Sequence, residues 1–402
     1  MAKGLARKQV SEFTRRIDAE LAALASQDQL RCLAAIGGVN LCSNDYLGLA
    51  TDPRLRAAVA SALTEGLPVA STGSRLLSGN AEIWEVLEFE IAQFIGSEAA
   101  LYFNSGYSAN VGLLSALIRP ADIVFSDAAN HASLIDGLRL SSARKAIFPH
   151  LDMDALEQEL CKDCSGAAQK FIVSESIFSM DGDRAPISDL VALAERYGAE
   201  LIIDEAHATG VVGPQGKGLV AACGLSERIL VTVHPCGKAL AGMGCFVCCS
   251  QKLKQYLVNR ARPFIFSTAL PPYVAAQMRA AIRIVAAADR ERNDLAVLAA
   301  FLRDRLRQGA FDIGSGDTQI IPVFLGENER AVRFSALLNE AGFGVRPIRP
   351  PSVPAGTSRL RLSLNAKLST TLLARFADAL ISIREREQVP LQEQVPLHAV
   401  QP

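Results

Sequence analysis

Lys238 lies just beyond an apolar run, and an acid and an imidazole end the preceding apolar run of the chain. The earlier run covers residues 201–203 and stops at Asp204, with His207 three residues further on. The later run covers residues 229–231 and leads into the Gly-Lys turn that contains Lys238. Open α/β sheets keep their chemistry at the ends of neighbouring strands, so we expect the three side chains at one site. A Schiff-base lysine, a carboxylate facing a pyridinium nitrogen and polar groups around a phosphorylated aldehyde together indicate a pyridoxal-phosphate enzyme.

Short apolar runs alternate with helical stretches between about residues 99 and 250. This spacing is typical of a mainly parallel sheet that is covered by helices on both faces. We expect one of the intervening helices to begin at the N-cap Ser188 and to stop at Gly198. Apolar residues at helical spacing predict a further helix over residues 83–95, before the sheet. The runs that we expect as strands are residues 100–103, 123–125, 171–173, 201–203, 229–231 and 245–248.

The pattern of apolar and charged residues changes beyond about residue 285. A charged helix over residues 289–308 is followed by strand, helix and strand patterns, which indicates a smaller α+β domain. A repeated EQVPL motif near the C-terminus has prolines that bar regular helix and offers no apolar face to bury. The four expected segments are an N-terminal helical segment (1–45), a large cofactor-binding domain (46–285), a small C-terminal domain (286–385) and a flexible tail (386–402).

The composition excludes several classes of protein. The 402 residues carry 41 Lys and Arg against 42 Asp and Glu, and the basic residues are spread out. There is therefore no electrostatic footprint for nucleic acid or for an anionic membrane. No apolar run approaches the ~18 residues of a membrane span, and the N-terminus has no apolar signal region. We expect a cytoplasmic protein with a large core and with neither nucleic acid nor membrane as a partner.

Nine cysteines are scattered through the chain. An odd number without an export signal favours reduced thiols over a disulfide framework. Two pairs have CxxC spacing: Cys161 with Cys164 in a polar loop, and Cys245 with Cys248 in an apolar run. Alternate residues of a strand face opposite sides, so the second pair would be split between the two faces of a sheet. We expect no metal site.

Nine short strings, taken in their order and spacing, make this chain resemble the α-oxoamine synthases from about residue 31 to residue 384. That resemblance implies a fold-type I pyridoxal-phosphate transferase of the aspartate-aminotransferase kind. Its large domain would hold a mainly parallel seven-stranded sheet, followed by a smaller C-terminal α+β domain. The strings are SNDYLGL (43–49), STGSR (71–75), SGY (105–107), NHASLI (130–135), ESIFSMDGD (175–183), DEAH (204–207), GKA (237–239), FST (266–268) and RPP (349–351).

The resemblance also assigns roles around the cofactor. It makes Lys238 the Schiff-base lysine that moves the proton at the substrate Cα, and a desolvated amine suits both tasks. Asp204 would face the pyridinium nitrogen and keep it protonated. His131 matches the residue that stacks on the cofactor ring. His207 matches the residue that bonds the phenolic oxygen, with Ser179 nearby.

The start of a helix after Ser105 is the candidate phosphate site. There the amides of Gly106 and Tyr107 would face a dianion that the helix dipole favours, although an ordinary N-cap is the simpler alternative. In the resembled family Thr268 reaches the phosphate of the neighbouring subunit, which implies a homodimer with shared active sites.

Two positions depart from the family pattern. Pro235 replaces a threonine whose hydroxyl contacts phosphate, and proline supplies neither a hydroxyl nor an N–H. Either Thr232 or His234 compensates, or the affinity for the cofactor is lower. Trp84 replaces a family histidine, and packing in the core would explain it.

Residues 348–361 (IRPPSVPAGTSRLR) look most like the member of the family that joins L-alanine to a pimeloyl thioester, carried by coenzyme A or by a carrier protein. Arg361 is the candidate for a substrate carboxylate, because a guanidinium grips it bidentately. A solvated cationic face shared by Arg359 and Arg361 is the alternative. The other residues that match substrate positions are Arg31, Asn44, Arg349 and Ser352.

Two other functions stay open at the level of sequence. One is a sister synthase of the family: glycine C-acetyltransferase, 5-aminolevulinate synthase or a serine palmitoyltransferase-like enzyme. The other is a homologue that binds the cofactor but has lost catalysis, which the proline at position 235 favours slightly.

Overall fold

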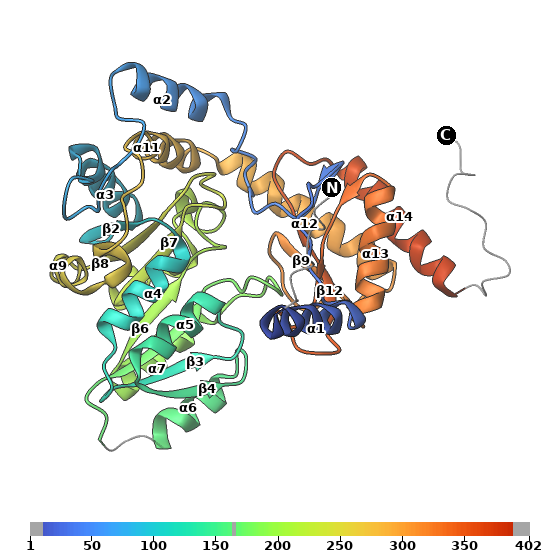
Figure 1. Ribbon diagram of the computed structural model, residues 1–402, viewed down its shortest axis with the longest axis horizontal. Coiled ribbons are helices and arrows are strands. Elements are labelled where there is room, and N and C mark those ends of the chain that lie inside the picture. Colours follow the sequence, from blue (N-terminus) through green and yellow to red (C-terminus); the bar gives the residue numbers. More distant parts are fainter. Residues whose placement is uncertain (1–10, 163–165, 389–402) are drawn as a thin grey trace, which may run out of the picture.

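A seven-stranded sheet forms the centre of the larger part of the molecule in the computed structural model, which describes residues 11–162 and 166–388 (Figure 1). The strand order is β2-β8-β7-β6-β5-β3-β4, and within this sheet β8 alone runs opposite to the other strands. The predicted mainly parallel sheet is therefore confirmed. The strands are β2 (Ala99–Phe103), β3 (Ile123–Asp127), β4 (Arg144–Phe148), β5 (Lys170–Glu175), β6 (Ala199–Asp204), β7 (Val231–Pro235) and β8 (Cys245–Cys249).

Helices cover both faces of this sheet, as its apolar strands require. One buried apolar cluster packs α4 (Gly106–Leu117), α5 (Ala132–Ser141), α9 (Gln251–Arg260) and α10 (Arg262–Ile265) on the first face. The cluster on the other face includes α3 (Glu82–Ile95), α6 (Met153–Lys162), α7 (Ile187–Tyr197) and α11 (Tyr273–Ala286). Cys245 belongs to the first cluster and Cys248 to the second, so this CxxC pair is split between the faces as expected.

The smaller part of the molecule is a three-stranded antiparallel sheet backed by helices (Figure 1). Its helix α12 (Asp289–Gln308) has the predicted bounds and leads from the larger part into the smaller one. The sheet order is β11-β12-β9, with β11 (Pro347–Ile348), β12 (Ser358–Ser363) and β9 (Ile320–Gly326). The other elements here are α13 (Asn328–Glu340), α14 (Thr370–Gln388) and the pair β1 (Val39–Asn40) with β10 (Phe343–Gly344).

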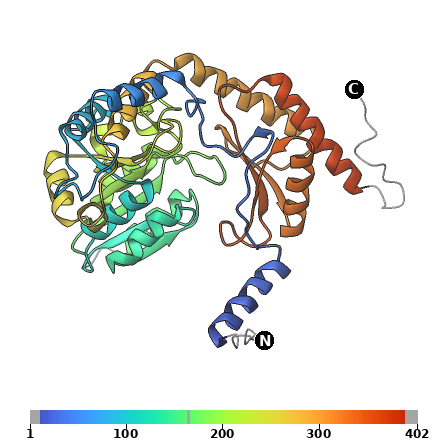
Figure 2. The same ribbon diagram turned by 45° about the horizontal axis from the view of Figure 1, so that its top comes forward.

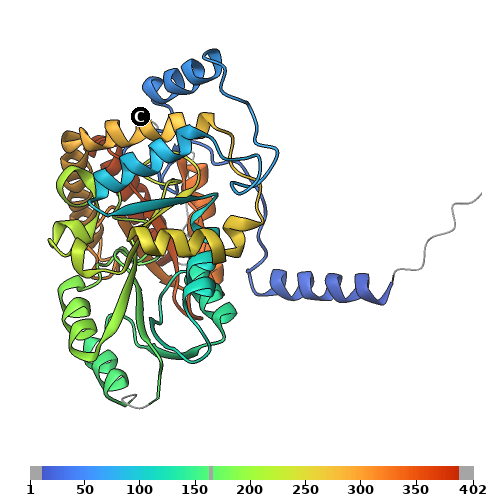
Figure 3. The ribbon, with the colours of Figure 1, turned by 90° about the vertical axis from the view of Figure 1, so that its left-hand side faces the viewer.

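The N-terminal helix α1 (Glu12–Ser26) projects away from the rest of the molecule (Figures 2 and 3). None of its residues is buried, and its apolar side chains are exposed. A second peripheral helix, α2 (Pro53–Thr64), packs on α11. Of the expected tail, residues up to Gln388 belong to α14, and residues 389–402 lie outside the described residues.

Two local predictions need correction, and one strand was missed. Ser188 is not an N-cap, because the first bond of α7 runs from the amide of Leu190 to the carbonyl of Pro186 and the helix begins at Ile187. Strand β7 begins at Val231 rather than at residue 229. The edge strand β4 was not predicted, because it carries polar, exposed residues.

Trp84 is almost fully buried and stacks on Tyr102 at a ring distance of 5.2 Å, so it packs in the core. Within the described part of the chain, no helix is both long and apolar enough to cross a membrane. Over the same residues, no three His, Cys, Asp or Glu side chains are grouped to hold a metal ion, and Cys164 is outside them.

Candidate active site

A cavity of about 540 Å³ opens where the carboxyl ends of β5, β6 and β7 meet the starts of α4 and α5. This is the edge at which a parallel sheet collects its functional side chains. The cavity contains most of the residues that the sequence predicted for the site. Those that line it are Asn44, Gly106, Tyr107, His131, Ser179, Asp204, His207, Lys238 and Arg361.

Asp204 ends β6 and is held in a fixed orientation. Its Oδ1 accepts the backbone N–H of Ala206 at 2.9 Å, and its Oδ2 accepts Nδ2 of Asn110 at 2.7 Å. The same Nδ2 donates to the hydroxyl of Ser133 at 2.9 Å. Hydrogen bonds to both oxygens stabilise the ionised form of a buried carboxyl group. Asp204 therefore presents a fixed negative charge to the cavity.

His131 caps the start of α5, and its imidazole is neutral. Its Nδ1 accepts the backbone N–H of Ser133 at 3.2 Å, which requires an unprotonated nitrogen there. Burial lowers the pKa of His131, Lys238 lowers it further, and the charge of Asp204 opposes them. A neutral ring at the cavity wall is suited to stacking on a flat aromatic ligand.

His207 is buried beside Lys238 and is fixed from two sides. Its Nδ1 lies 2.6 Å from the hydroxyl of Tyr46, and its carbonyl accepts Nε2 of Gln319 at 2.9 Å. Burial lowers the pKa of His207 well below its ordinary value, and the positive charges of Lys238 and Arg361 add to this effect. His207 is therefore a neutral hydrogen-bonding group of the cavity.

Arg361 reaches the cavity from β12 of the smaller part of the molecule. Its guanidinium donates to the carbonyl of Ser179, to Oδ1 of Asn44 at 3.1 Å and to the hydroxyl of Ser363 at 2.7 Å. Arg359, two residues earlier, instead bonds Asp181 and lies over the ring of Phe324. Of these two arginines, only Arg361 lines the cavity.

The start of α4 offers backbone amides to an anion. Ser105 caps the helix, and Gly106 and Tyr107 are its first residues and line the cavity. A Cβ atom on Gly106 would lie 2.9 Å from Cγ of Pro235, so the close approach of the backbone to this ring requires glycine. The amides of Gly106 and Tyr107 and the helix dipole together suit a phosphate group.

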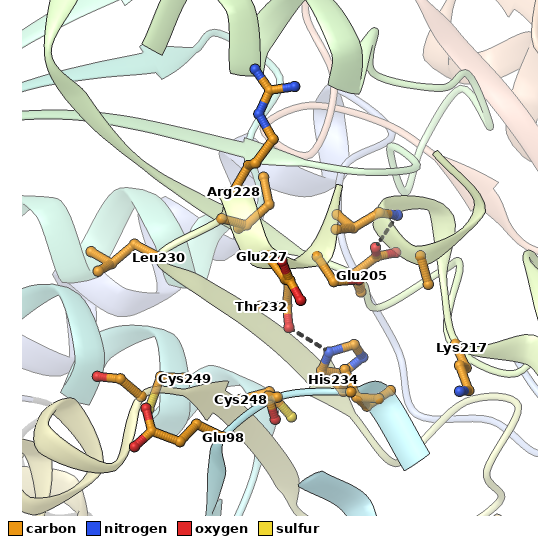
Figure 4. A pocket seen from close by; sticks show the side chains of 18 of the residues that line it. Glu98, Glu205, Lys217, Glu227, Arg228, Leu230, Thr232, His234, Cys248 and Cys249 are labelled. Atoms are coloured by element: carbon orange, nitrogen blue, oxygen red, sulfur yellow. Dashed lines mark hydrogen bonds between the residues drawn. The ribbon is translucent and has the colours of Figure 1, made fainter. Parts of the chain in front are cut away.

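Neither Thr232 nor His234 replaces the missing threonine at position 235. Both side chains are on the opposite face of β7 and line a second cavity, where they are 2.8 Å apart (Figure 4). The other ring nitrogen of His234 bonds Thr209, also at 2.8 Å. Burial lowers the pKa of His234 to about 3, so it is a neutral structural residue. Of the alternatives that the sequence left open, a lower affinity for the cofactor therefore remains.

Four predicted residues do not line the cavity. The carbonyl of Thr268 accepts Nδ2 of Asn104, a cavity residue, at 2.6 Å, and this contact places Thr268 just outside. Arg31 bonds the carbonyl of Pro350 at 3.3 Å. Arg349 donates to a backbone carbonyl of the N-terminal segment and accepts, through its own carbonyl, the amide of Ser352. These last three residues cluster beside Ile348, which lines the cavity.

Sequence reasoning missed Asn110, Ser133 and Glu175. Asn110 and Ser133 carry the hydrogen bonds that orient Asp204 and His131. Glu175 lines the cavity and pairs in register with Asp204 across β5 and β6. A signal was available for Glu175, because it ends a buried strand in the same way as Asp204.

The residues present fit pyridoxal phosphate. The amine of Lys238, the fixed carboxylate of Asp204 and the neutral ring of His131 share one cavity with the anion site at α4. The side-chain Oδ1 of Asn110 and Oε1 of Glu175 are buried without a hydrogen-bond partner, which marks a polar wall to which a ligand can donate hydrogen bonds.

Residues 36–380 match the family model for class I and II aminotransferases, and the chain belongs to this family. It is similar to an 8-amino-7-oxononanoate synthase from Geobacter sulfurreducens, with 45% identity over 386 residues that cover 92% of this chain and 98% of the relative. Among solved structures, the chain is similar to SPT (serine palmitoyltransferase) with pyridoxal phosphate, with a TM-score of 0.86 at 30% identity. The match covers 94% of this chain and 99% of the SPT chain. The 8-amino-7-oxononanoate synthase from Francisella tularensis has a TM-score of 0.75 at 26% identity, and the match covers 88% of this chain and 99% of the Francisella chain.

Proposed function

We propose that this chain is an 8-amino-7-oxononanoate synthase that uses pyridoxal 5'-phosphate to condense L-alanine with a pimeloyl thioester, with loss of carbon dioxide, in biotin synthesis. The observation that carries the proposal is the convergence of Lys238, Asp204 and His131 on one cavity. The choice of substrates is supported by the 45% identity to the Geobacter sulfurreducens synthase over nearly the whole of both chains.

When bound, pyridoxal phosphate supplies an aldehyde that condenses with amines and a protonated ring that withdraws electrons from the substrate Cα. Lys238 would hold the aldehyde through its amine, and the same amine, once free, would take the proton from Cα. Lys238 also returns a proton at Cα after carbon dioxide has left. Asp204 keeps the ring nitrogen protonated through its fixed negative charge.

The other cavity residues orient the reacting groups. The imidazole of His131 would stack on the ring of the cofactor, and His207 with Ser179 would bond its phenolic oxygen. The amides of Gly106 and Tyr107 bind the phosphate at the start of α4. Lying against the cavity, Arg361 grips the substrate carboxylate. Asn44 fixes one side of that guanidinium, at 3.1 Å.

The cluster beside the cavity binds the acyl thioester. Arg31 and Arg349 supply two positive charges there, and burial, followed by the neighbouring charge of Arg31, lowers the pKa of Arg349. Ser352 adds a hydroxyl on the same segment, since its backbone amide is already bonded to the carbonyl of Arg349. Two guanidinium groups are suited to an anionic carrier, whether coenzyme A or the phosphopantetheine of a carrier protein.

The active form is a homodimer with shared sites, in which Thr268 reaches the phosphate of the second subunit. Two large apolar side chains are exposed in the single chain, with Leu77 81% and Phe266 70% accessible. Their segments are joined by the bond from the amide of Ala269, next to Thr268, to the carbonyl of Gly73 at 2.9 Å. Exposed apolar groups of this size are typical of surfaces that a partner covers. Sedimentation of Phe266→Asp should show monomers, whereas Val297→Asp, at a side chain 63% exposed on α12, should stay dimeric.

The reaction is tested by adding amino acids to the protein loaded with pyridoxal phosphate. A change in the visible spectrum with alanine, and product formation when pimeloyl-CoA or a pimeloyl carrier protein follows, are the expected results. Lys238→Ala should abolish turnover and change the visible absorption of the loaded protein. Turnover that survives in this variant would refute the assignment.

A serine-using sister enzyme is the second candidate. SPT superposes with a higher TM-score than the Francisella tularensis synthase, 0.86 against 0.75, although its identity to this chain is 30%. A spectral response to serine or glycine in place of alanine would support such a sister enzyme. Binding of the cofactor without a response to any of the three amino acids would indicate a homologue that has lost catalysis.

A further inference from the structure

Glu175 places a second carboxyl group next to Asp204. It is the last residue of β5, it is 1% exposed, and it lines the same cavity. Its register partner on β6 is Asp204 itself. Two carboxyl groups at the ends of adjacent buried strands rarely both ionise, because each charge opposes the other. One of the two is therefore expected to keep its proton.

The hydrogen bonds of the two groups decide which of them is protonated. Both oxygens of Asp204 accept strong bonds, from Asn110 and from the backbone of Ala206. By contrast, Oε1 of Glu175 is buried without any partner. An ionised carboxylate needs donors on both oxygens to offset the loss of water, and Asp204 has them whereas Oε1 of Glu175 has none.

Burial and the neighbouring negative charges also favour a protonated Glu175. Burial is the largest effect that raises the pKa of Glu175 well above its ordinary value, and the charges of Asp204 and Asp127 add to it. The backbone N–H of His131 and the positive charge of Lys238 oppose this rise but do not cancel it.

We propose that Glu175 keeps its proton at neutral pH and is a positioning residue that leaves Asp204 as the single carboxylate at this end of the cavity. The inference rests on the proposed function, since the single charge is matched to one protonated ring nitrogen of the cofactor. The protonated carboxyl group of Glu175 is a neutral hydrogen-bond donor in the cavity wall beside Asp204. The wall is then polar without a second negative charge.

Infrared difference spectra of the protein without cofactor test the protonation directly. The wild-type protein should show the carbonyl band of a protonated carboxyl group, and Glu175→Gln should remove it while Asp204→Asn should keep it. A band that Asp204→Asn removes, or one that Glu175→Gln leaves unchanged, would overturn the inference. If Glu175→Gln fails to fold, titration of the wild-type band decides: its survival above about pH 7 is expected, and its loss below that pH overturns the inference.

Binding of pyridoxal phosphate gives a second, independent result. The neutral isostere Glu175→Gln should bind the cofactor within about threefold of the wild-type affinity, whereas Asp204→Asn should bind at least about tenfold more weakly. An equal loss in the two variants would show that a negative charge at Glu175 is needed, and would contradict the inference. A wild-type protein that fails to bind pyridoxal phosphate would refute the proposed function, and the infrared result would still decide the protonation.

Discussion

His150 and Asp183 lie 2.9 Å apart, from Nε2 of the imidazole to Oδ2 of the carboxylate. The other ring nitrogen lies 2.8 Å from Oδ1 of Asp127, at the end of β3. Because both nitrogens face acceptors, both must carry a proton, and the ring is an imidazolium ion. Asp183 belongs to the same string as Ser179, so His150 ties the segment that reaches the cavity to the central sheet.

This ion pair predicts a loss of stability at alkaline pH. Burial lowers the pKa of His150, but the hydrogen bonds to Asp127 and Asp183 outweigh it and raise the pKa to about 10. A raised pKa stabilises the folded state fully below the unfolded value of about 6.5, and this contribution is lost as the pH rises through about 10. Relative to His150→Gln, the free energy of unfolding of the wild type should fall by about 2 kcal/mol across this window.

Urea unfolding of the two proteins at several pH values measures this difference. Subtracting the variant removes the contributions of other groups that titrate in the same range. Parallel pH profiles for the wild type and His150→Gln would contradict the assigned imidazolium ion.

Arg361→Lys should weaken the binding of alanine. Lysine keeps the positive charge but loses the planar fork that bonds Ser179 and Asn44 and faces the cavity. We expect the KM for alanine to rise at least about tenfold, with a smaller effect on kcat. The matched control is Arg359→Lys, because Arg359 bonds Asp181 away from the cavity and should affect stability instead. Equal effects of both substitutions on KM would contradict the role of Arg361.

The parts of the fold that the sequence predicted are those where one periodicity dominates. The unbroken apolar runs of β5 and β6 and the charged helix α12 all appear where they were expected. The edge strand β4 was missed because it pairs with a strand, β3, on one side only and most of its residues, among them Lys145, are exposed to water. Hydrogen bonding along an edge leaves little trace in a pattern of hydrophobicity.

The candidate site was predictable where a polar residue ends a buried strand. Asp204 follows this rule, and the turn after β7 brings Lys238 to the same cavity. Asn110 was missed because it lies within a helix, where only the tertiary packing of α4 shows that it faces Asp204. Arg31 was expected near substrate, but its bond to the carbonyl of Pro350 depends on a fold of the chain that spacing does not reveal.

Asn110→Ala should lower the affinity for pyridoxal phosphate. The substitution removes the donor to Oδ2 of Asp204, and a hydrogen bond to a charged group is worth about 1.5–3 kcal/mol. We therefore expect an affinity at least about tenfold lower, measured by absorbance titration. Ser115→Ala, which removes a bond to the carbonyl of Val111 on the same helix, is the matched control. An unchanged affinity in Asn110→Ala would show that Asp204 does not depend on this donor.

Pro235→Thr should raise the affinity for the cofactor. Pro235 lines the cavity beside Gly106, where the resembled family carries a threonine hydroxyl that contacts phosphate. Since Thr232 and His234 face the second cavity, nothing on β7 replaces this hydroxyl. One hydrogen bond to an anion is worth about 1 kcal/mol or more, so roughly fivefold tighter binding is expected. Pro235→Val, which has no hydroxyl, should not reproduce the gain, and an equal gain in both variants would attribute the effect to the loss of the proline ring.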